Sequence, residues 1–155
     1  VNESWDGTSW TEVGDLNTAR YGMGAGGIQT SVLQFGGHSG TAVVNNVESW
    51  DGTSWTETTE MNTKRTSLGG TGSNANNILA FGGLDPPGRQ NETEFWNGSS
   101  WTELNNLSTA RQDFGSSSAL SITNVIASGG ETGPAVSAAT EEWTVNLGNK
   151  TITSS

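Results

Sequence analysis

The chain has 155 residues, with 22 glycines, seven tryptophans and no cysteine. Six basic against sixteen acidic residues give it a net charge of −10, and a surface of that sign repels nucleic-acid phosphates and anionic lipid. We therefore expect no nucleic-acid partner, no membrane insertion, no disulfide and no thiolate metal site.

The first expected element is a short hairpin at residues 1–13, VNESWDGTSWTEV, and closely similar sequences recur along the chain. VESWDGTSWTE stands at residues 47–57 and TEFWNGSSWTE at residues 93–103. Self-similarity of this kind marks a repeat architecture, in which neighbouring units bury a shared core. The repeated tryptophans are Trp5, Trp50, Trp96 and Trp143, followed by Trp10, Trp55 and Trp101, and the glutamates before the first series are Glu3, Glu48, Glu94 and Glu141.

After this hairpin, each unit predicts four short strands. A glycine-rich strand at residues 20–27 begins with Arg20, and its counterparts begin with Arg65 and Arg111. An apolar strand follows, as in SVLQFGG at residues 31–37, and ends in a glycine doublet. The third and fourth strands form the tryptophan hairpin.

The residues between the tryptophans predict how this hairpin turns. Asp51-Gly52 favours a two-residue type I′ turn, because glycine and aspartate tolerate positive φ. That turn would pair Trp50 with Thr53, whereas a four-residue turn would pair Trp50 with Trp55. Either turn places both tryptophan rings on one face of the sheet.

These units predict an all-β protein built of four-stranded antiparallel sheets, arranged as β-propeller blades. Small residues fit the axis where inner strands converge, and tryptophans fit the wider periphery. The expected parts are an outer hairpin of a preceding blade at 1–13 and three full blades at 14–57, 58–103 and 104–155, the last with NLGNKTITSS in place of the tryptophan strand. Three and a half blades leave sheet faces open, so either further blades precede these residues, which the half blade favours, or copies of the chain associate to close the ring.

The glycine doublet after an apolar strand, and the tryptophan that follows it, resemble the kelch repeat. The resemblance extends from about Trp5 to Trp143 and implies a kelch-like β-propeller, in which the arginine position begins the innermost strand near the channel mouth and can face a ligand. The chain differs by using tryptophan where kelch repeats usually have tyrosine, and by Ser128 before the third doublet. The repeat sequence ESWDGTSWTEV is also similar to repeats in virion and tail-associated proteins of environmental phages.

The sequence predicts no catalytic residues, no metal site and no cofactor. The glutamates recur in every unit, whereas a catalytic carboxylate pair needs two different environments. His38 is the single histidine and Tyr21 the single tyrosine, so the copper ligands of kelch-fold oxidases cannot be assembled from this chain.

Candidate binding residues lie at the arginine positions and in the loops that differ most between units, at 38–44, 84–90 and 131–139. A ring of guanidinium groups could hold a carboxylate or a sulfate. The alternative, which we favour, is that each arginine pairs with a repeat glutamate or a loop carbonyl and ties one unit to the next. The candidates are Arg20, Arg65, Arg111, His38, Asp85 and Arg89, and the asparagines that match the glycosylation sequon are Asn2, Asn91, Asn97, Asn106 and Asn149.

The expected function is that of a non-enzymatic structural or binding module of a virion appendage, such as a tail or fibre, or of an extracellular surface protein. It would recognise protein or glycan through one propeller face, as part of a larger assembly or as a homo-oligomer. Two alternatives stay open: a lectin-like carbohydrate-binding domain, and a non-catalytic part of a larger kelch-fold enzyme.

Overall fold

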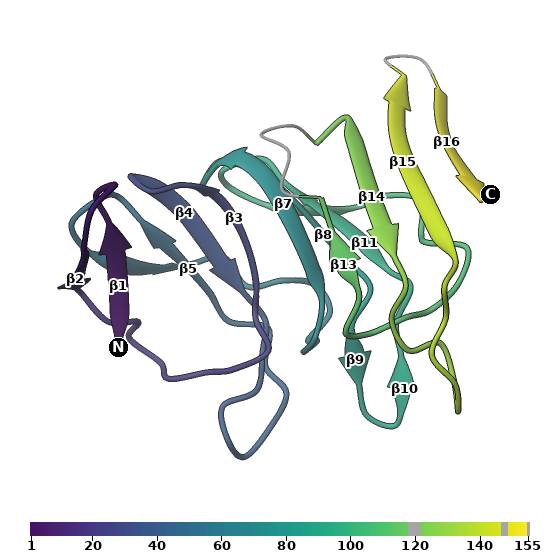
Figure 1. The fold of residues 1–155 in the computed structure, drawn as a ribbon, viewed down its shortest axis with the longest axis horizontal. Helices are drawn as coiled ribbons and strands as arrows, with labels where there is room; N and C mark the ends of the chain where they lie inside the picture. The colour runs from purple at the N-terminus through teal and green to yellow at the C-terminus, as the bar shows by residue number, and fades with distance from the viewer. Residues whose placement is uncertain (118–121, 147–148, 155) are drawn as a thin grey trace.

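A computed structural model of the protein describes residues 1–117, 122–146 and 149–154, and this part of the chain contains β-strands and no helix. A two-stranded hairpin is followed by three four-stranded antiparallel sheets, in which the strands are neighbours in chain order. Figure 1 shows the hairpin and the sheets side by side, from the N-terminal hairpin at one end to the third sheet at the other. The predictions of an all-β fold and of four strands in each unit are confirmed.

The strand bounds define the units. The hairpin is β1 (Asn2–Trp5) and β2 (Trp10–Val13). The first sheet is β3 (Gly24–Ile28), β4 (Ser31–Phe35), β5 (Val47–Trp50) and β6 (Trp55–Thr58). The second is β7 (Gly69–Asn74), β8 (Asn77–Phe81), β11 (Thr93–Trp96) and β12 (Trp101–Glu103). The third is β13 (Gly115–Ser116), β14 (Asn124–Ser128), β15 (Thr140–Asn146) and β16 (Asn149–Ser154), and a small hairpin, β9 (Leu84–Asp85) and β10 (Gly88–Arg89), projects from the second.

One expectation about strand positions is wrong. The glycine-rich strands begin at Gly24, Gly69 and Gly115, so the arginines lie in the segments before them and not at their first residues. As expected, the segment at 146–155 stands in place of the last tryptophan strand: its residues 149–154 form β16, which pairs with β15 as the fourth strand of the third sheet.

Of the two turns considered for the tryptophan hairpin, the four-residue turn is confirmed, and the two-residue turn favoured by Asp51-Gly52 is wrong. Trp50 pairs directly with Trp55, and the equivalent tryptophans of the other two hairpins pair in the same register. Asp51 causes the difference: its Oδ1 accepts hydrogen bonds from the backbone N–H groups of Thr53 and Ser54, at 2.8 and 2.9 Å. This side-chain turn competes with the type I′ turn. The paired tryptophan rings lie 5.3 Å apart between centroids.

The glycine-rich strands bring the backbones of neighbouring sheets together. β3 lies against β7, and β7 lies against β13. A Cβ atom on Gly70 would stand 2.6 Å from the carbonyl oxygen of Ala25, and one on Gly26 would stand 2.9 Å from the carbonyl carbon of Thr71. Side chains therefore cannot be accommodated at these positions without moving one sheet away from the next.

Alternate residues of β8 face the two neighbouring sheets and form the core. Ile78 and Ala80 belong to the cluster shared with the first sheet, and Leu79 and Phe81 to the cluster shared with the third. Trp101 of the second sheet packs edge-on against Phe35 of the first, with centroids 5.5 Å apart.

In the third sheet the same alternation leaves one face open. Val125 and Ala127 are buried toward the second sheet. Ile126 and Ser128, at the positions of Leu79 and Phe81, are exposed. The aromatic residue that the first two sheets offer to a following sheet is therefore replaced by a hydroxyl in the third.

The packing of the tryptophans predicts a large difference between two of them. Trp96 is 2% exposed and Trp10 is 64% exposed. We expect Trp96→Ala to lower the free energy of unfolding by about 3–5 kcal/mol, because a large side chain leaves a cavity in the core. Trp10→Ala, the matched control, should cost much less. Equal losses in equilibrium denaturation of the two variants would contradict this packing.

The Asp51 turn predicts a pH-dependent contribution to stability. The hydrogen bonds from Ser54 and Thr53 hold the pKa of Asp51 below its ordinary value. A depressed folded-state pKa contributes stability above the unfolded pKa, which is lost as the pH falls through the folded pKa. Asp51→Ala should lower the Tm at neutral pH, and its deficit should shrink in acid. Asp51→Asn should be milder at neutral pH, since Asn97 makes the same two contacts in the second sheet, and a deficit that does not vary with pH would contradict the role of the carboxylate.

Candidate functional site

Each repeat arginine forms a buried ion pair with the glutamate of its own sheet. The Nη2–Oε1 distances are 2.8 Å for Arg20 and Glu48, 2.8 Å for Arg65 and Glu94, and 2.6 Å for Arg111 and Glu141. The arginine side chains are completely buried. The expected pairing of each arginine with a repeat glutamate is confirmed, but the ion pair lies within one sheet and does not itself tie one unit to the next.

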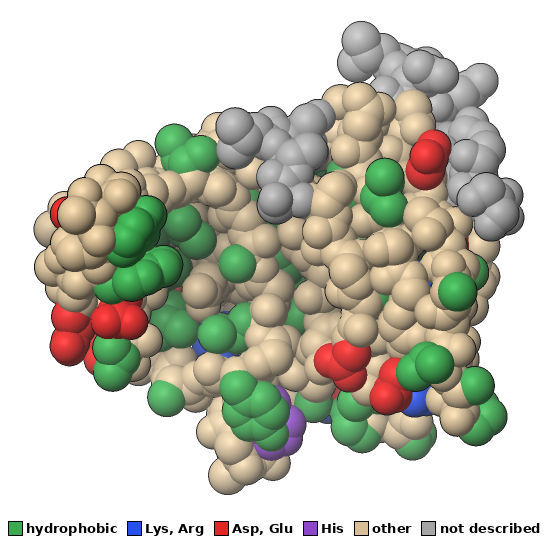
Figure 2. All heavy atoms as spheres, viewed as in Figure 1, with side chains coloured by type: hydrophobic (Ala, Val, Ile, Leu, Met, Phe, Trp, Pro, Cys, Tyr) green, Lys and Arg blue, Asp and Glu red, His purple; other side chains and the backbone are tan. Residues whose placement is uncertain are grey.

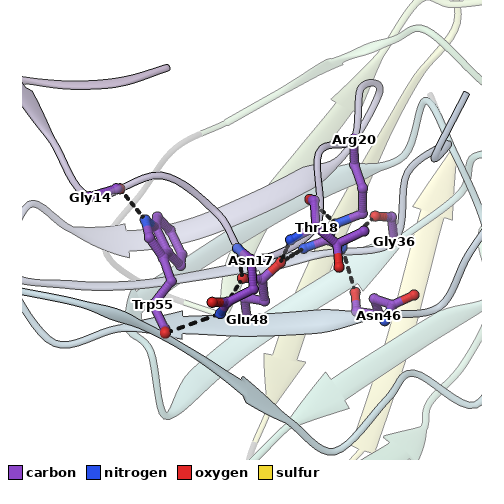
Figure 3. A network of polar contacts seen from close by, with 8 residues as sticks. All are labelled: Gly14, Asn17, Thr18, Arg20, Gly36, Asn46, Glu48 and Trp55. Atoms are coloured by element: carbon purple, nitrogen blue, oxygen red, sulfur yellow. Dashed lines mark hydrogen bonds and ion pairs between the residues drawn. The ribbon is translucent and has the colours of Figure 1, made fainter.

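Figure 3 shows how the loop before β3 wraps the Glu48 carboxylate. Oε2 accepts from the backbone N–H and the side-chain amide of Asn17, at 2.7 and 2.9 Å, and Oε1 accepts from the Arg20 guanidinium. The same Asn17 amide also donates to the carbonyl of Trp55, so the loop is held to the tryptophan hairpin. Glu94 and Glu141 accept from the corresponding backbone groups in their sheets.

The arginines also link neighbouring sheets through the glycine doublets. Arg20 Nη1 donates to the carbonyl of Gly36, at 2.8 Å, within the first sheet. Gly37 then donates its backbone N–H to the carbonyl of Arg65, at 2.7 Å, across to the second. Gly36 and Gly37 have φ of 64° and 103°, and a Cβ on Gly36 would lie 2.5 Å from the Arg65 carbonyl oxygen. The doublet is therefore required both by the backbone conformation and by the close approach of the next sheet.

This environment decides what the arginines can do chemically. Burial lowers the pKa of the Arg65 guanidinium, and the negative charges of Glu94 and Glu92 oppose that shift. The three guanidinium groups are enclosed and already bonded to carboxylates and carbonyls. They present no exposed surface to a carboxylate or sulfate from solution.

The loops that differ between units lie together at one end of the sheets, the lower end in Figure 1. Isolated backbone bridges hold each loop against the residue that follows the arginine. The bridges are Tyr21 with His38, Thr66 with Leu84, and Gln112 with Glu131. We call a set of exposed and half-buried residues at this end the loop face: the exposed Tyr21 and Lys64, and the half-buried His38, Asp85, Arg89, Gln112 and Glu131.

His38 lies on the loop face and stacks against Tyr21, with ring centroids 5.0 Å apart. Its Nδ1 accepts a hydrogen bond from the backbone N–H of Gly40, at 2.9 Å. In the neutral imidazole this contact leaves the proton on Nε2. The Tyr21 side chain is 61% exposed, so part of this aromatic pair faces solvent.

Asp85 and Arg89 lie on opposite strands of the small β9–β10 hairpin, and each forms an ion pair with a different residue. Asp85 pairs with Lys64 at 3.4 Å. Arg89 reaches the third sheet and pairs with Glu131 at 2.7 Å, and Gln112 donates to the same carboxylate at 3.3 Å. Both ion pairs are partly exposed.

Sequence reasoning did not single out four members of the loop face, Tyr21, Lys64, Gln112 and Glu131, although Glu131 lies in the loop at 131–139 that it indicated. The signal that could have found three of them is their position directly beside a repeat arginine, at residues 21, 64 and 112. Glu131 follows a glycine doublet, at the same position as His38 and Leu84.

Within residues 1–117, 122–146 and 149–154, no group of three or more His, Asp or Glu side chains is placed to hold a metal ion. In the same part of the chain, no helix is long and apolar enough to cross a membrane. Neither a comparison with protein-family models nor a search of curated proteins finds a match to this chain.

The buried ion pair predicts a large stability effect next to a small one. Replacing Arg65 with Gln leaves Glu94 without its counter-ion, and we expect a loss of about 3–5 kcal/mol in the free energy of unfolding. Lys64→Gln breaks only the exposed pair with Asp85 and should cost less than about 1 kcal/mol. Chemical denaturation of the two neighbouring variants measures both, and similar losses would contradict a structural role specific to Arg65.

Proposed function

We propose that the sheets are blades of a kelch-like β-propeller and that the chain is a non-enzymatic structural or binding module, part of a virion appendage or an extracellular surface protein. The proposal places recognition of a protein or a glycan on the loop face. One observation supports it most. Loops of different composition lie at the same end of three sheets, and each sheet contains the same buried arginine–glutamate pair.

The propeller arrangement is supported by how neighbouring sheets meet. The glycine-rich strands approach through their backbones, as at Gly70 and Ala25, whereas the opposite edges of the sheets carry the large tryptophan hairpins. Neighbouring sheets are therefore close together at one edge and held apart by large rings at the other, so the space between them is wedge-shaped. Wedges of this kind stack around an axis.

A structural or binding role is supported by the equivalence of the repeated carboxylates. Glu48, Glu94 and Glu141 accept the same set of bonds in their three sheets. Catalysis by a carboxylate pair needs one acid and one base with different environments. Identical, buried carboxylates serve the fold in each unit.

The lectin-like alternative is favoured by one feature of the loop face. Tyr21 and His38 expose a stacked aromatic pair, and the flat apolar faces of sugar rings pack well on aromatic side chains. Asp85, Arg89 and Gln112 are polar groups on the same face that can hydrogen-bond hydroxyls.

The proposal predicts that ligand binding depends on the loop face. The test applies the purified chain to an immobilised glycan panel and to a panel of extracellular proteins. Tyr21→Ala and Arg89→Gln should weaken binding at least about tenfold, as expected for contacts worth 1.4 kcal/mol or more. Glu57→Gln and Glu103→Gln, on the outer strands β6 and β12, are controls and should leave binding unchanged.

The pattern of binding separates the candidates. Saturable binding to one class of sugar supports the lectin-like alternative, and binding confined to proteins supports the assembly module. Binding whose affinity is the same for the original chain and for the Tyr21→Ala and Arg89→Gln variants would contradict the proposal, and so would turnover of a bound glycan.

A further inference from the structure

Two positions after each repeat arginine, the backbone adopts a left-handed conformation. Gly22, Ser67 and Asp113 stand at this position in the three sheets, with φ of 65°, 53° and 50°, and we call them the inner row. Glycine adopts a positive φ freely, whereas a residue with a Cβ atom is strained there. Among the described residues, Ser67 and Asp113 are the only ones other than glycine with a positive φ.

Backbone hydrogen bonds join the inner row from sheet to sheet. Ser67 donates its N–H to the carbonyl of Gly22, at 2.7 Å, and Asp113 donates its N–H to the carbonyl of Ser67, at 3.2 Å. Backbones joined in this way lie about 5 Å apart, so the row from Gly22 to Asp113 is about 10 Å long. Three sheets therefore each contribute one residue to a continuous line.

The two strained residues do not use their side chains to hold the sheets together. The Ser67 hydroxyl forms no hydrogen bond within the described part of the chain. Asp113 is exposed, and its Oδ2 accepts from Nε2 of the adjacent Gln112, at 2.9 Å. Its Oδ1 has no hydrogen-bond partner among the same residues. Strained backbone that the surrounding structure holds in place clusters at ligand sites, and here it carries a free hydroxyl and a free carboxylate oxygen.

The inner row lies at the same end of the sheets as the loop face. Tyr21, directly before Gly22, bridges to His38, and Gln112, directly before Asp113, bridges to Glu131. Figure 2 shows His38, in purple, at the lower margin of the molecule beside hydrophobic atoms, with acidic side chains on the same face. An exposed aromatic ring therefore stands at one end of the row and a carboxylate at the other.

We propose that the inner row and Tyr21 bind a neutral saccharide of at least two rings. One ring packs its apolar face on Tyr21, and hydroxyls of a second ring bond to the Ser67 hydroxyl and donate to Oδ1 of Asp113. Two rings are needed because one ring cannot reach both ends of a line about 10 Å long. Gln112 is a positioning residue, since it holds the carboxylate through Oδ2.

Charge and backbone bonding select this ligand. The net charge of −10 and the carboxylate of Asp113 disfavour sulfated or carboxylated sugars. A peptide strand cannot be added along the row by backbone pairing, because the N–H groups of Ser67 and Asp113 already donate to the carbonyls of Gly22 and Ser67. The groups that are left to bind a ligand are an aromatic ring and side-chain oxygens, which suit sugar hydroxyls.

The saccharide site rests on the proposed function, because it uses Tyr21 of the loop face, and it adds the ligand class and two contact residues. The two can fail separately. Protein binding that is lost in Tyr21→Ala would support the proposed function and exclude the saccharide.

The test measures binding of the full chain to immobilised maltose, lactose, cellobiose and N-acetyllactosamine, and to their sulfated forms, by surface plasmon resonance. Saturable binding to at least one neutral disaccharide is expected, with its sulfated form bound at least about tenfold more weakly. Asp113→Asn should weaken neutral binding at least about tenfold and reduce the preference over the sulfated form. Ser67→Gly should also weaken binding while raising the Tm by about 2–4 °C, because it removes the hydroxyl together with the backbone strain.

Asp51→Asn is the matched control, since it makes the same change in the turn at the other end of β5 from the loop face. It should leave the Kd nearly unchanged. Equal effects of Asp113→Asn and Asp51→Asn, or a Ser67→Gly variant with a lowered Tm, would overturn the inner row as the site. Binding of proteins but of no neutral disaccharide would overturn the saccharide alone. Binding of neither class by a chain whose circular dichroism and cooperative unfolding show it to be folded would overturn the saccharide and the proposed function together.

Discussion

The buried pair between a guanidinium and a carboxylate, repeated in each sheet, is the interaction on which the rest of this structure depends. Burying Glu94 and Arg65 together removes two charges from water, and the penalty is offset only when nearly every lone pair and N–H finds a partner. The backbone N–H groups of Asn62 and Thr63 and the carbonyls of Gly82 and Glu92 provide those partners. The segment before each inner strand, the end of the apolar strand and the start of the tryptophan hairpin therefore have to meet at one point.

The same constraint sets the relation between sheets. The carbonyl of Arg65 accepts from Gly37 of the preceding sheet, and that of Arg111 accepts from Gly83. An arginine whose side chain is fixed within one sheet thus holds the neighbouring sheet through its backbone. The glycine-rich strands then lie too close for side chains, and Trp101 of the second sheet meets Phe35 of the preceding sheet. The register between sheets follows from these two contacts at opposite edges.

The sequence was sufficient for the fold class and the strand order, because the repeat fixes equivalent positions without knowledge of any distance. It also indicated that the repeat arginines pair with the repeat glutamates, but not that each pair lies within its own sheet. The turn at Asp51 could not be decided from Asp-Gly alone, because the side chain competes with the backbone for the same N–H groups. The pairing of Arg89 with Glu131 depends on how two different loops approach across sheets, and nothing in either segment specifies the partner.

The replacement of an aromatic residue by Ser128 makes one face of the third sheet different from the corresponding faces of the first two sheets. On the following face of the first and second sheets, Phe35 and Phe81 provide an apolar surface, whereas the third sheet presents Ser128 and an exposed Ile126. A further sheet added there would find a hydroxyl where its tryptophan needs a ring. The face of the third sheet that carries Ser128 is therefore chemically unlike the faces that carry Phe35 and Phe81, and it cannot give a tryptophan the edge-on ring contact that Phe35 gives Trp101.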